Sequence, residues 1–91
     1  MEKYLVIIQK AGNNYGAYSP DVLGCISTGK TIEETLQNMR DALIFHLEGM
    51  MDDNEPLPLS KGLAYYLQQP APIANENDLI TYVHLQIPQL V

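Results

Sequence analysis

The chain has 91 residues, of which 46% are hydrophobic and 18% are charged, and its formal charge is −6. This length corresponds to one domain with a modest core, and the tyrosine and aliphatic content excludes a chain that is disordered throughout. Eleven acidic residues against five basic ones make a poor binder of nucleic-acid phosphates, whereas a basic partner would be attracted.

The first predicted elements form a β-hairpin. Residues 3–10 read as a strand with apolar side chains on both faces, which is typical of a central strand covered on each side. Residues 11–14 are glycine and asparagine rich and predict a turn, and residues 15–19 predict the returning strand.

A second turn and a short third strand follow. Pro20 and Asp21 start the turn, because proline fixes φ and lacks the N–H that a central strand needs. Residues 24–28 read as the third strand, and Gly29 ends it. Gly24 and Gly29 are therefore expected to be structural.

The clearest element is a long helix. Thr31 is placed to cap its N-terminus, with Glu34 three residues on to complete a capping box. The helix is expected to end near Met51 or Asp52. Apolar side chains recur at helical spacing along one stripe: Ile32, Leu36, Met39, Leu43, Leu47 and Met50.

The segment 52–78 contains four prolines, and Ser60 is placed to cap a short helix carrying Leu63, Tyr66 and Leu67. Residues 79–87 alternate in polarity and predict a fourth strand.

We therefore predict an α+β fold of order β-β-β-α-β, with a mixed four-stranded sheet of order 3-2-1-4 packed on one main helix. In this prediction the last strand lies parallel to the first through a right-handed crossover. The helix covers one sheet face, and either segment 57–68 or a second copy of the chain covers the other.

Several parts of the sequence resemble the HicB antitoxin family. The resemblance rests on the first strand, the Pro-Asp-Val-Leu-Gly-Cys turn of residues 20–25, the helix start of residues 29–36, Ala42-Leu43 and the proline-containing residues 55–58. It implies a partial ribonuclease-H-like fold. It also implies a function, in which the domain binds and blocks a small basic toxin that cleaves mRNA.

The sequence departs from the family pattern in three places. Lys30 stands where the family often has aspartate, Thr35 where it often has alanine, and the segment 52–78 is longer than usual. Many family members also carry a C-terminal DNA-binding domain. We expect a single HicB-like domain over residues 1–91 with no DNA-binding domain and no direct nucleic-acid contact.

The sequence predicts neither catalysis, nor a cofactor, nor a metal site. Ribonuclease H chemistry needs carboxylates converging on metal ions, one of them in the first strand, and residues 3–10 contain no acid. His46 and His84 are not paired at a metal-ligand spacing. Cys25, the only cysteine, is expected to be a buried small hydrophobe.

The absence of a possible internal disulfide fits a reducing compartment. The sequence shows no signal-peptide pattern and no apolar run near the ~20 residues of a membrane helix. We expect a cytoplasmic chain without membrane contact.

Six residues are candidates for binding a basic partner. Glu34 is primarily a cap, and Asp21 is primarily expected to bond nearby backbone N–H groups. Phe45 lies about 180° from Leu36 on the helix. Three interpretations of Phe45 stay open. It is an isolated exposed aromatic without a role, an apolar anchor surrounded by acidic residues in a binding face, or a residue packed under segment 57–68. The candidates are Asp21, Glu33, Glu34, Asp41, Phe45 and Glu48.

Two functions follow from these observations. The first is a HicB-like antitoxin domain that binds a small basic toxin of HicA type. The alternative is an orphan structural or regulatory module that self-associates, with a homodimer as the commonest outcome.

Overall fold

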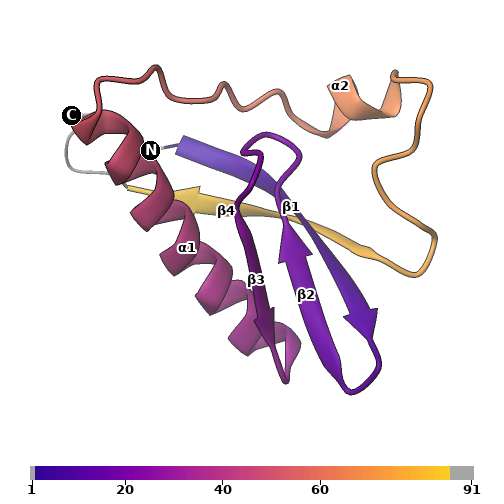
Figure 1. Cartoon of the computed structure of the whole chain (residues 1–91). Helices are drawn as coiled ribbons and strands as arrows, with labels where there is room; N and C mark the ends of the chain where they lie inside the picture. The colour runs from indigo at the N-terminus through magenta and orange to yellow at the C-terminus, as the bar shows by residue number, and fades with distance from the viewer. Residues whose placement is uncertain (1, 87–91) are drawn as a thin grey trace.

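The computed structural model describes residues 2–86 (Figure 1). The predicted order of elements is confirmed, although Ile87, the last residue of the predicted fourth strand, lies outside the described residues. The elements are β1 (Glu2–Ala11), β2 (Asn14–Tyr18), β3 (Ile26–Gly29), α1 (Ile32–Asp52), α2 (Leu63–Leu67) and β4 (Leu79–Leu85). None of the helices in this range is long and apolar enough to cross a bilayer.

The predicted strand order is confirmed, but the predicted direction of β4 is wrong. The sheet has the order β3-β2-β1-β4, and every neighbouring pair is antiparallel, so the sheet is not mixed. In the β1–β4 pair, Ile8 lies opposite Leu79 and Lys3 opposite His84.

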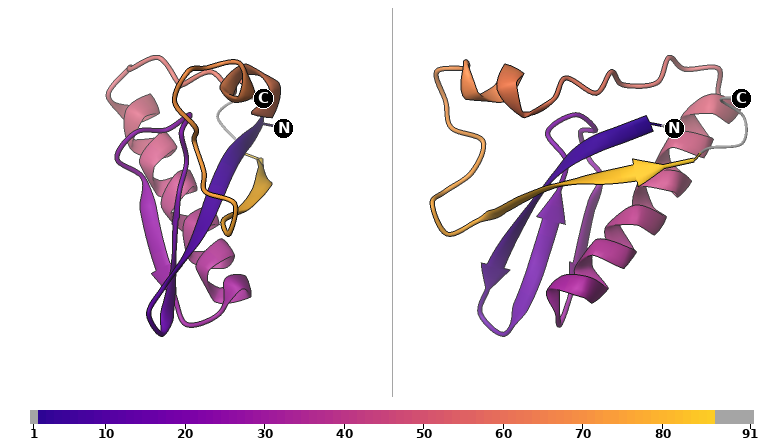
Figure 2. Two further views of the ribbon diagram at one scale, coloured as in Figure 1. Left: turned by 90° about the vertical axis from the view of Figure 1, so that its right-hand side faces the viewer. Right: turned by 180° about the vertical axis from the view of Figure 1, so that it is seen from behind.

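The connection after α1 explains the direction of β4. Residues 53–78, here called the strap, run from the end of α1 past α2 to the end of the sheet at which β1 finishes (Figures 1 and 2). The chain therefore enters β4 at that end and returns antiparallel to β1. The prediction assumed that the chain enters β4 where the helix ends.

One face of the sheet packs on α1, as predicted from the helical stripe. Thr35 is buried as well, while Ile32, Leu36 and Met50 are half-buried at the margins. The fully buried hydrophobic members of this layer are Tyr4, Val6, Val22, Met39, Leu43, Leu47, Val83 and Leu85.

The strap covers the opposite face, which confirms that this chain supplies its own cover there. Leu5 and Ile7 of β1 are fully buried against Tyr66 of α2. The predicted cap of the short helix is wrong, because Gly62 and not Ser60 precedes α2, with φ 83° and no side-chain capping bond.

Tyrosine hydroxyls of the sheet hold the strap at three points. Two hydroxyls donate to strap carbonyls, and the third accepts a strap N–H at 2.8 Å. These bonds satisfy polar groups that the strap would otherwise bury unpaired. They join Tyr4 to Pro58, Tyr18 to Ile73 and Tyr82 to Leu63.

The turn before β3 forms as predicted. The N–H of Val22 donates to the carbonyl of Ser19 at 3.3 Å, and the N–H of Cys25 donates to the carbonyl of Val22 at 3.4 Å. Gly24 has φ +85°, a conformation that side chains disfavour, which accounts for glycine after the Pro20 turn.

The predicted Thr31 cap of α1 is confirmed, whereas Glu34 closes back on the residue before the cap and not on Thr31 itself. Thr31 Oγ1 accepts from the N–H of Glu34 at 3.0 Å, while Glu34 Oε1 accepts from the N–H of Lys30 at 3.1 Å. Gly29 passes so close to the first turn of α1 that a Cβ there would lie 2.6 Å from Thr35 Oγ1 and 2.7 Å from its backbone N. Glycine at 29 is therefore required by this contact.

We expect Gly29→Ala to lower the free energy of unfolding by about 2–3 kcal/mol, because the added methyl group overlaps the backbone of α1. Gly16→Ala is the matched control, since its Cβ would meet an atom of Ser27 at an ordinary 3.8 Å; its effect should stay within about 0.5 kcal/mol. Urea denaturation followed by circular dichroism measures both, and equal losses would contradict the contact argument.

Candidate functional site

Four of the six candidate residues lie along the outer face of α1. Glu34, Asp41, Phe45 and Glu48 fall within one narrow sector of the helix at ~100° per residue, opposite the buried residues Met39, Leu43 and Leu47. The same helical spacing places Asp52 in this sector, two turns after Phe45, although Asp52 was not among the six candidates. We call these five residues the acidic face of α1: Glu34, Asp41, Phe45, Glu48 and Asp52.

Phe45 is the apolar centre of the acidic face. Its side chain is 81% exposed, so the reading that places it under segment 57–68 is wrong. Phe45 lies on the side of α1 opposite the buried residues Met39, Leu43 and Leu47, so it faces away from the sheet. An exposed phenylalanine with a carboxylate one turn before it and another one turn after it has the composition of an anchor for a cationic partner.

The charged residues of α1 are mostly acidic. The helix carries five acids and a single arginine, Arg40, whose guanidinium bonds the carbonyl of His84. Glu33 and Glu34 complement the positive end of the helix dipole, whereas Asp52 lies at its negative end, where no basic residue is present in the last turn. A cationic partner over this end would relieve that unfavourable placement.

Asp21 and Glu33 do not belong to the acidic face. Glu33 is exposed on the flank of α1, about 120° from Phe45 at ~100° per residue. Asp21 lies in the turn before β3 and contacts the strap, which covers the sheet face opposite α1. The structure thus brings four of the six candidates together and separates these two.

The carboxylate of Asp21 joins β1 to the strap. Its Oδ1 accepts from the hydroxyl of Tyr66 at 2.6 Å and from the N–H of Lys61 at 3.1 Å, and its Oδ2 accepts from the N–H of Leu5 at 3.2 Å. The turn sequence predicts donors from nearby in the chain, whereas these donors lie 16 to 45 residues away. Because three internal donors occupy it, we leave Asp21 out of the proposed binding face.

Two tyrosines under the strap have perturbed acidities. Burial, followed by the hydrogen bond to Asp21, raises the pKa of Tyr66. Burial and then the charge of Asp78 raise the pKa of Tyr18. Both phenols are therefore held in their neutral form by the folded chain.

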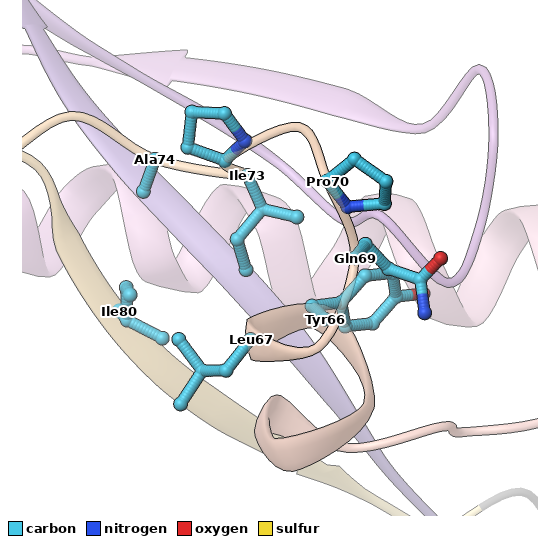
Figure 3. A pocket seen from close by; sticks show the side chains of 8 residues that line it. Tyr66, Leu67, Gln69, Pro70, Ile73, Ala74 and Ile80 are labelled. Carbon is cyan, nitrogen blue, oxygen red and sulfur yellow. The ribbon is translucent and has the colours of Figure 1, made fainter.

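The strap also forms an apolar pocket that the sequence analysis missed (Figure 3). Its volume is about 240 Å³, and its wall includes Tyr66, Leu67 and Ile73 of the strap and Ile80 at the start of β4. The signal in the sequence was Leu79-Ile80, two successive apolar residues at the start of an otherwise alternating strand.

Cys25, His46 and His84 lie on three different parts of the fold. Cys25 is buried, and burial raises the pKa of its thiol, so the prediction of a buried small hydrophobe is confirmed. His84 is exposed on β4 and His46 is half-buried on α1. Over residues 2–86, no group of three or more His, Cys, Asp or Glu side chains is arranged to hold a metal ion.

Comparison with known proteins identifies the family. A family described as HicB_like antitoxin of bacterial toxin-antitoxin system matches residues 4–90, nearly the whole chain. The chain belongs to the HicB-like antitoxin family. The resemblance stated from the turn and the helix start is thereby confirmed, and the match extends across the strap and β4.

Similar proteins include viral and bacterial relatives of the HicB-like domain. One relative is an uncharacterized 14.9 kDa protein of the rep-hol intergenic region of Haemophilus phage HP1. The two are 35% identical over 97% of this chain, and this chain spans 64% of the length of the phage protein. A UPF0150 protein of Helicobacter pylori is 40% identical over 60% of this chain and 75% of its own length.

Solved structures confirm the fold. The Burkholderia pseudomallei antitoxin HicB aligns with a TM-score of 0.78 at 24% identity, over 98% of this chain and 67% of that one. A chain of a HicA3 and HicB3 toxin-antitoxin complex aligns with a TM-score of 0.74 at 27% identity, over 93% of this chain and 99% of that one. The α+β architecture with a sheet of order 3-2-1-4 is therefore that of HicB domains.

We expect Asp21→Ala to lower the free energy of unfolding by about 2–3 kcal/mol, because it leaves the N–H of Leu5 and the hydroxyl of Tyr66 without their acceptor. Asp41→Ala on the acidic face is the control and should cost less than about 0.5 kcal/mol. Limited proteolysis should show faster cleavage of the strap in Asp21→Ala alone. Equal proteolysis of both variants would contradict the role of Asp21 in holding the strap.

Stability should fall in alkaline solution through Tyr66. The folded chain raises the pKa of this phenol above its usual 10.0, so the unfolded chain loses the proton first. The contribution of Tyr66 is then present below pH 10 and is lost as pH rises above that value. Urea denaturation at a series of pH values should show a smaller alkaline loss in Tyr66→Phe than in the wild type. Parallel pH profiles would refute this assignment.

Proposed function

We propose that this domain is an antitoxin that binds and neutralises a small basic mRNA-cleaving toxin of HicA type. The observation that carries the proposal is the acidic face of α1, centred on an exposed Phe45, in a chain of the HicB-like antitoxin family. The similar chain in the HicA3 and HicB3 complex supports a partner of this kind.

Neutralisation follows from binding and needs no reaction by this chain. The four carboxylates of the acidic face attract a cationic protein, which speeds association and makes affinity depend on salt. Phe45 then supplies apolar contact at the centre of the interface, where exclusion of water strengthens the surrounding charge pairs. A ribonuclease whose basic substrate-binding surface is covered in this way cannot engage the phosphates of an mRNA.

In this proposal the domain is not an enzyme and works in the cytoplasm, where an mRNA-cleaving toxin acts. The fully buried anchoring residues of α1, Met39, Leu43 and Leu47, hold the acidic face in place before the partner arrives. Such preorganisation reduces the conformational cost of binding. A single-domain mode of action without DNA binding stays a prediction, because the phage relative is longer than this chain.

A second candidate function is self-association of the domain as an orphan module without a toxin. The sequence suggested self-association through the apolar sheet face opposite the helix, but the strap covers that face. The specific observation that now favours self-association is the outer edge of β4, which carries exposed apolar side chains.

The toxin proposal is tested with the product of a short, strongly cationic reading frame adjacent to the one that encodes this chain. We expect Phe45→Ala to weaken binding by roughly 30-fold, because it removes the apolar centre of the face. Leu59→Ala is the matched control, since Leu59 is 80% exposed but lies on the strap, and it should leave the affinity unchanged. Titration calorimetry at low and high salt measures both variants.

Growth of cells producing the toxin supplies the functional measurement. The wild-type chain should relieve toxicity, and Phe45→Ala should relieve it less than Leu59→Ala. If the cationic protein neither binds at low salt nor loses toxicity on co-expression, the antitoxin proposal is wrong. If Leu59→Ala weakens binding and Phe45→Ala does not, the acidic face is the wrong surface.

A further inference from the structure

The pocket under the strap joins two parts of the chain that are far apart in sequence. Tyr66, Leu67, Ile73 and Ala74 line it from the strap, and Ile80 lines it from the start of β4 (Figure 3). Its volume is about 240 Å³, whereas an apolar cavity of roughly 150 Å³ already holds benzene. The pocket therefore has room for a ring system of two fused cycles.

Hydrogen bonds behind the wall hold the pocket in shape. The hydroxyl of Tyr66 donates to Asp21 Oδ1 at 2.6 Å, which fixes the tyrosine ring. The carbonyl of Ile73 accepts from the hydroxyl of Tyr18 on β2, which fixes the opposite part of the wall. A wall that is already ordered lowers the conformational cost of binding a ligand.

The polar groups along the wall favour a ligand that donates hydrogen bonds. Pro70 and Pro72 belong to the wall and have no N–H, so the chain there offers carbonyl oxygens without matching donors. The side chains of Tyr66 and Gln69 already donate within the chain. The wall is therefore richer in acceptors than in donors.

A carboxylate lies at the margin of the pocket. Asp78 stands in the turn that joins the lining residues Ala74 and Ile80. Its Oδ2 accepts from Gln9 Nε2 at 3.2 Å and from the N–H of Asn75 at 2.8 Å. Both donors are neutral, so neither balances the charge of the carboxylate.

This part of the chain is acidic in sequence. Residues 62–86 contain neither lysine nor arginine, and Glu76 adds an exposed carboxylate to the turn before β4. Lys61 is held over a tyrosine ring that is not part of the wall. Lys10 follows Gln9 in β1, so its side chain points to the opposite face of the sheet. The margin of the pocket is suited to a cation supplied from outside.

We propose that the pocket under the strap binds a small aromatic amine, with a ring of one or two cycles and an ammonium group on a short chain. The ring contacts Leu67, Ile73 and Ile80, and the ammonium group faces Asp78 and the carbonyls of the proline-containing wall. The volume fits one ring system and not an extended chain, which favours a small molecule over a peptide. Because the ligand touches both the strap and β4, it fastens the strap to the sheet.

This inference does not depend on a toxin. The pocket lies on the strap side of the sheet, whereas the acidic face lies on the outer side of α1. Amine binding can therefore fail while toxin binding holds, and the reverse is also possible.

Nuclear magnetic resonance titration of the purified chain with three indoles tests the proposal. We expect tryptamine to shift the amide signals of Leu67, Ala74 and Ile80 saturably, with a dissociation constant of about 1 mM for a ligand of this size. Neutral indole should bind at least about threefold more weakly, and anionic indole-3-propionate more weakly still. Absence of saturable shifts at these amides, or equal affinity for the cation and the anion, overturns the proposal.

An isosteric variant tests the role of the carboxylate. Asp78→Asn keeps an acceptor for Gln9 and Asn75 but removes the charge, so the dissociation constant of tryptamine should rise about threefold while that of indole stays unchanged. Asp41→Asn on the acidic face is the matched control, because it changes the net charge equally at a distance from the pocket. Circular dichroism confirms that both variants are folded. An equal effect of the two variants on tryptamine contradicts the assignment of Asp78.

A pair of exposed leucines tests the wall. Leu67→Ala should weaken tryptamine and indole alike by about threefold, because it removes apolar contact from the ring. Leu59→Ala is the matched control, since Leu59 is also exposed on the strap but does not line the pocket, and it should leave both affinities unchanged. If both variants bind as the wild type does, or if both lose affinity equally, the ring does not occupy this pocket and the proposal is wrong.

Discussion

The fold depends on a strand that is apolar on both faces. Leu5 and Ile7 point to one side of β1 and Tyr4 and Val6 to the other, and all four are buried. A single helix covers only one face of such a sheet, so the chain needs a second layer to remove Leu5 and Ile7 from water. The strap provides that layer, and its length of more than twenty residues is a consequence of this requirement.

The strap has little regular structure, and polar contacts rather than a helix face hold it in place. Tyrosine hydroxyls from three strands and the carboxylate of Asp21 bond its backbone and its one buried aromatic ring, Tyr66. Each of these bonds joins parts of the chain far apart in sequence. Ordering so long a segment has a large entropic cost, and the buried apolar side chains and internal hydrogen bonds together offset it.

Local features of the fold could be predicted from the sequence, whereas its long-range contacts could not. The Thr31 cap, the apolar stripe of α1 and the consecutive order of β1, β2 and β3 depend on spacing and turn chemistry that a short window contains. The direction of β4 depends on where the strap ends in space, and no local pattern records that. Asp21 was assigned to its own turn for the same reason, because its partners lie on β1 and on the strap. The acidic face was largely predictable, since helical periodicity places its residues together once α1 is certain.

Two exposed surfaces of the chain differ in charge. Because the strap covers the second face of the sheet, the chain is left with an outward helix face and a sheet edge for contacts. The helix face concentrates negative charge around Phe45 and is suited to a partner of opposite charge. The β4 edge carries exposed apolar side chains, Leu79 and Ile80, at its start.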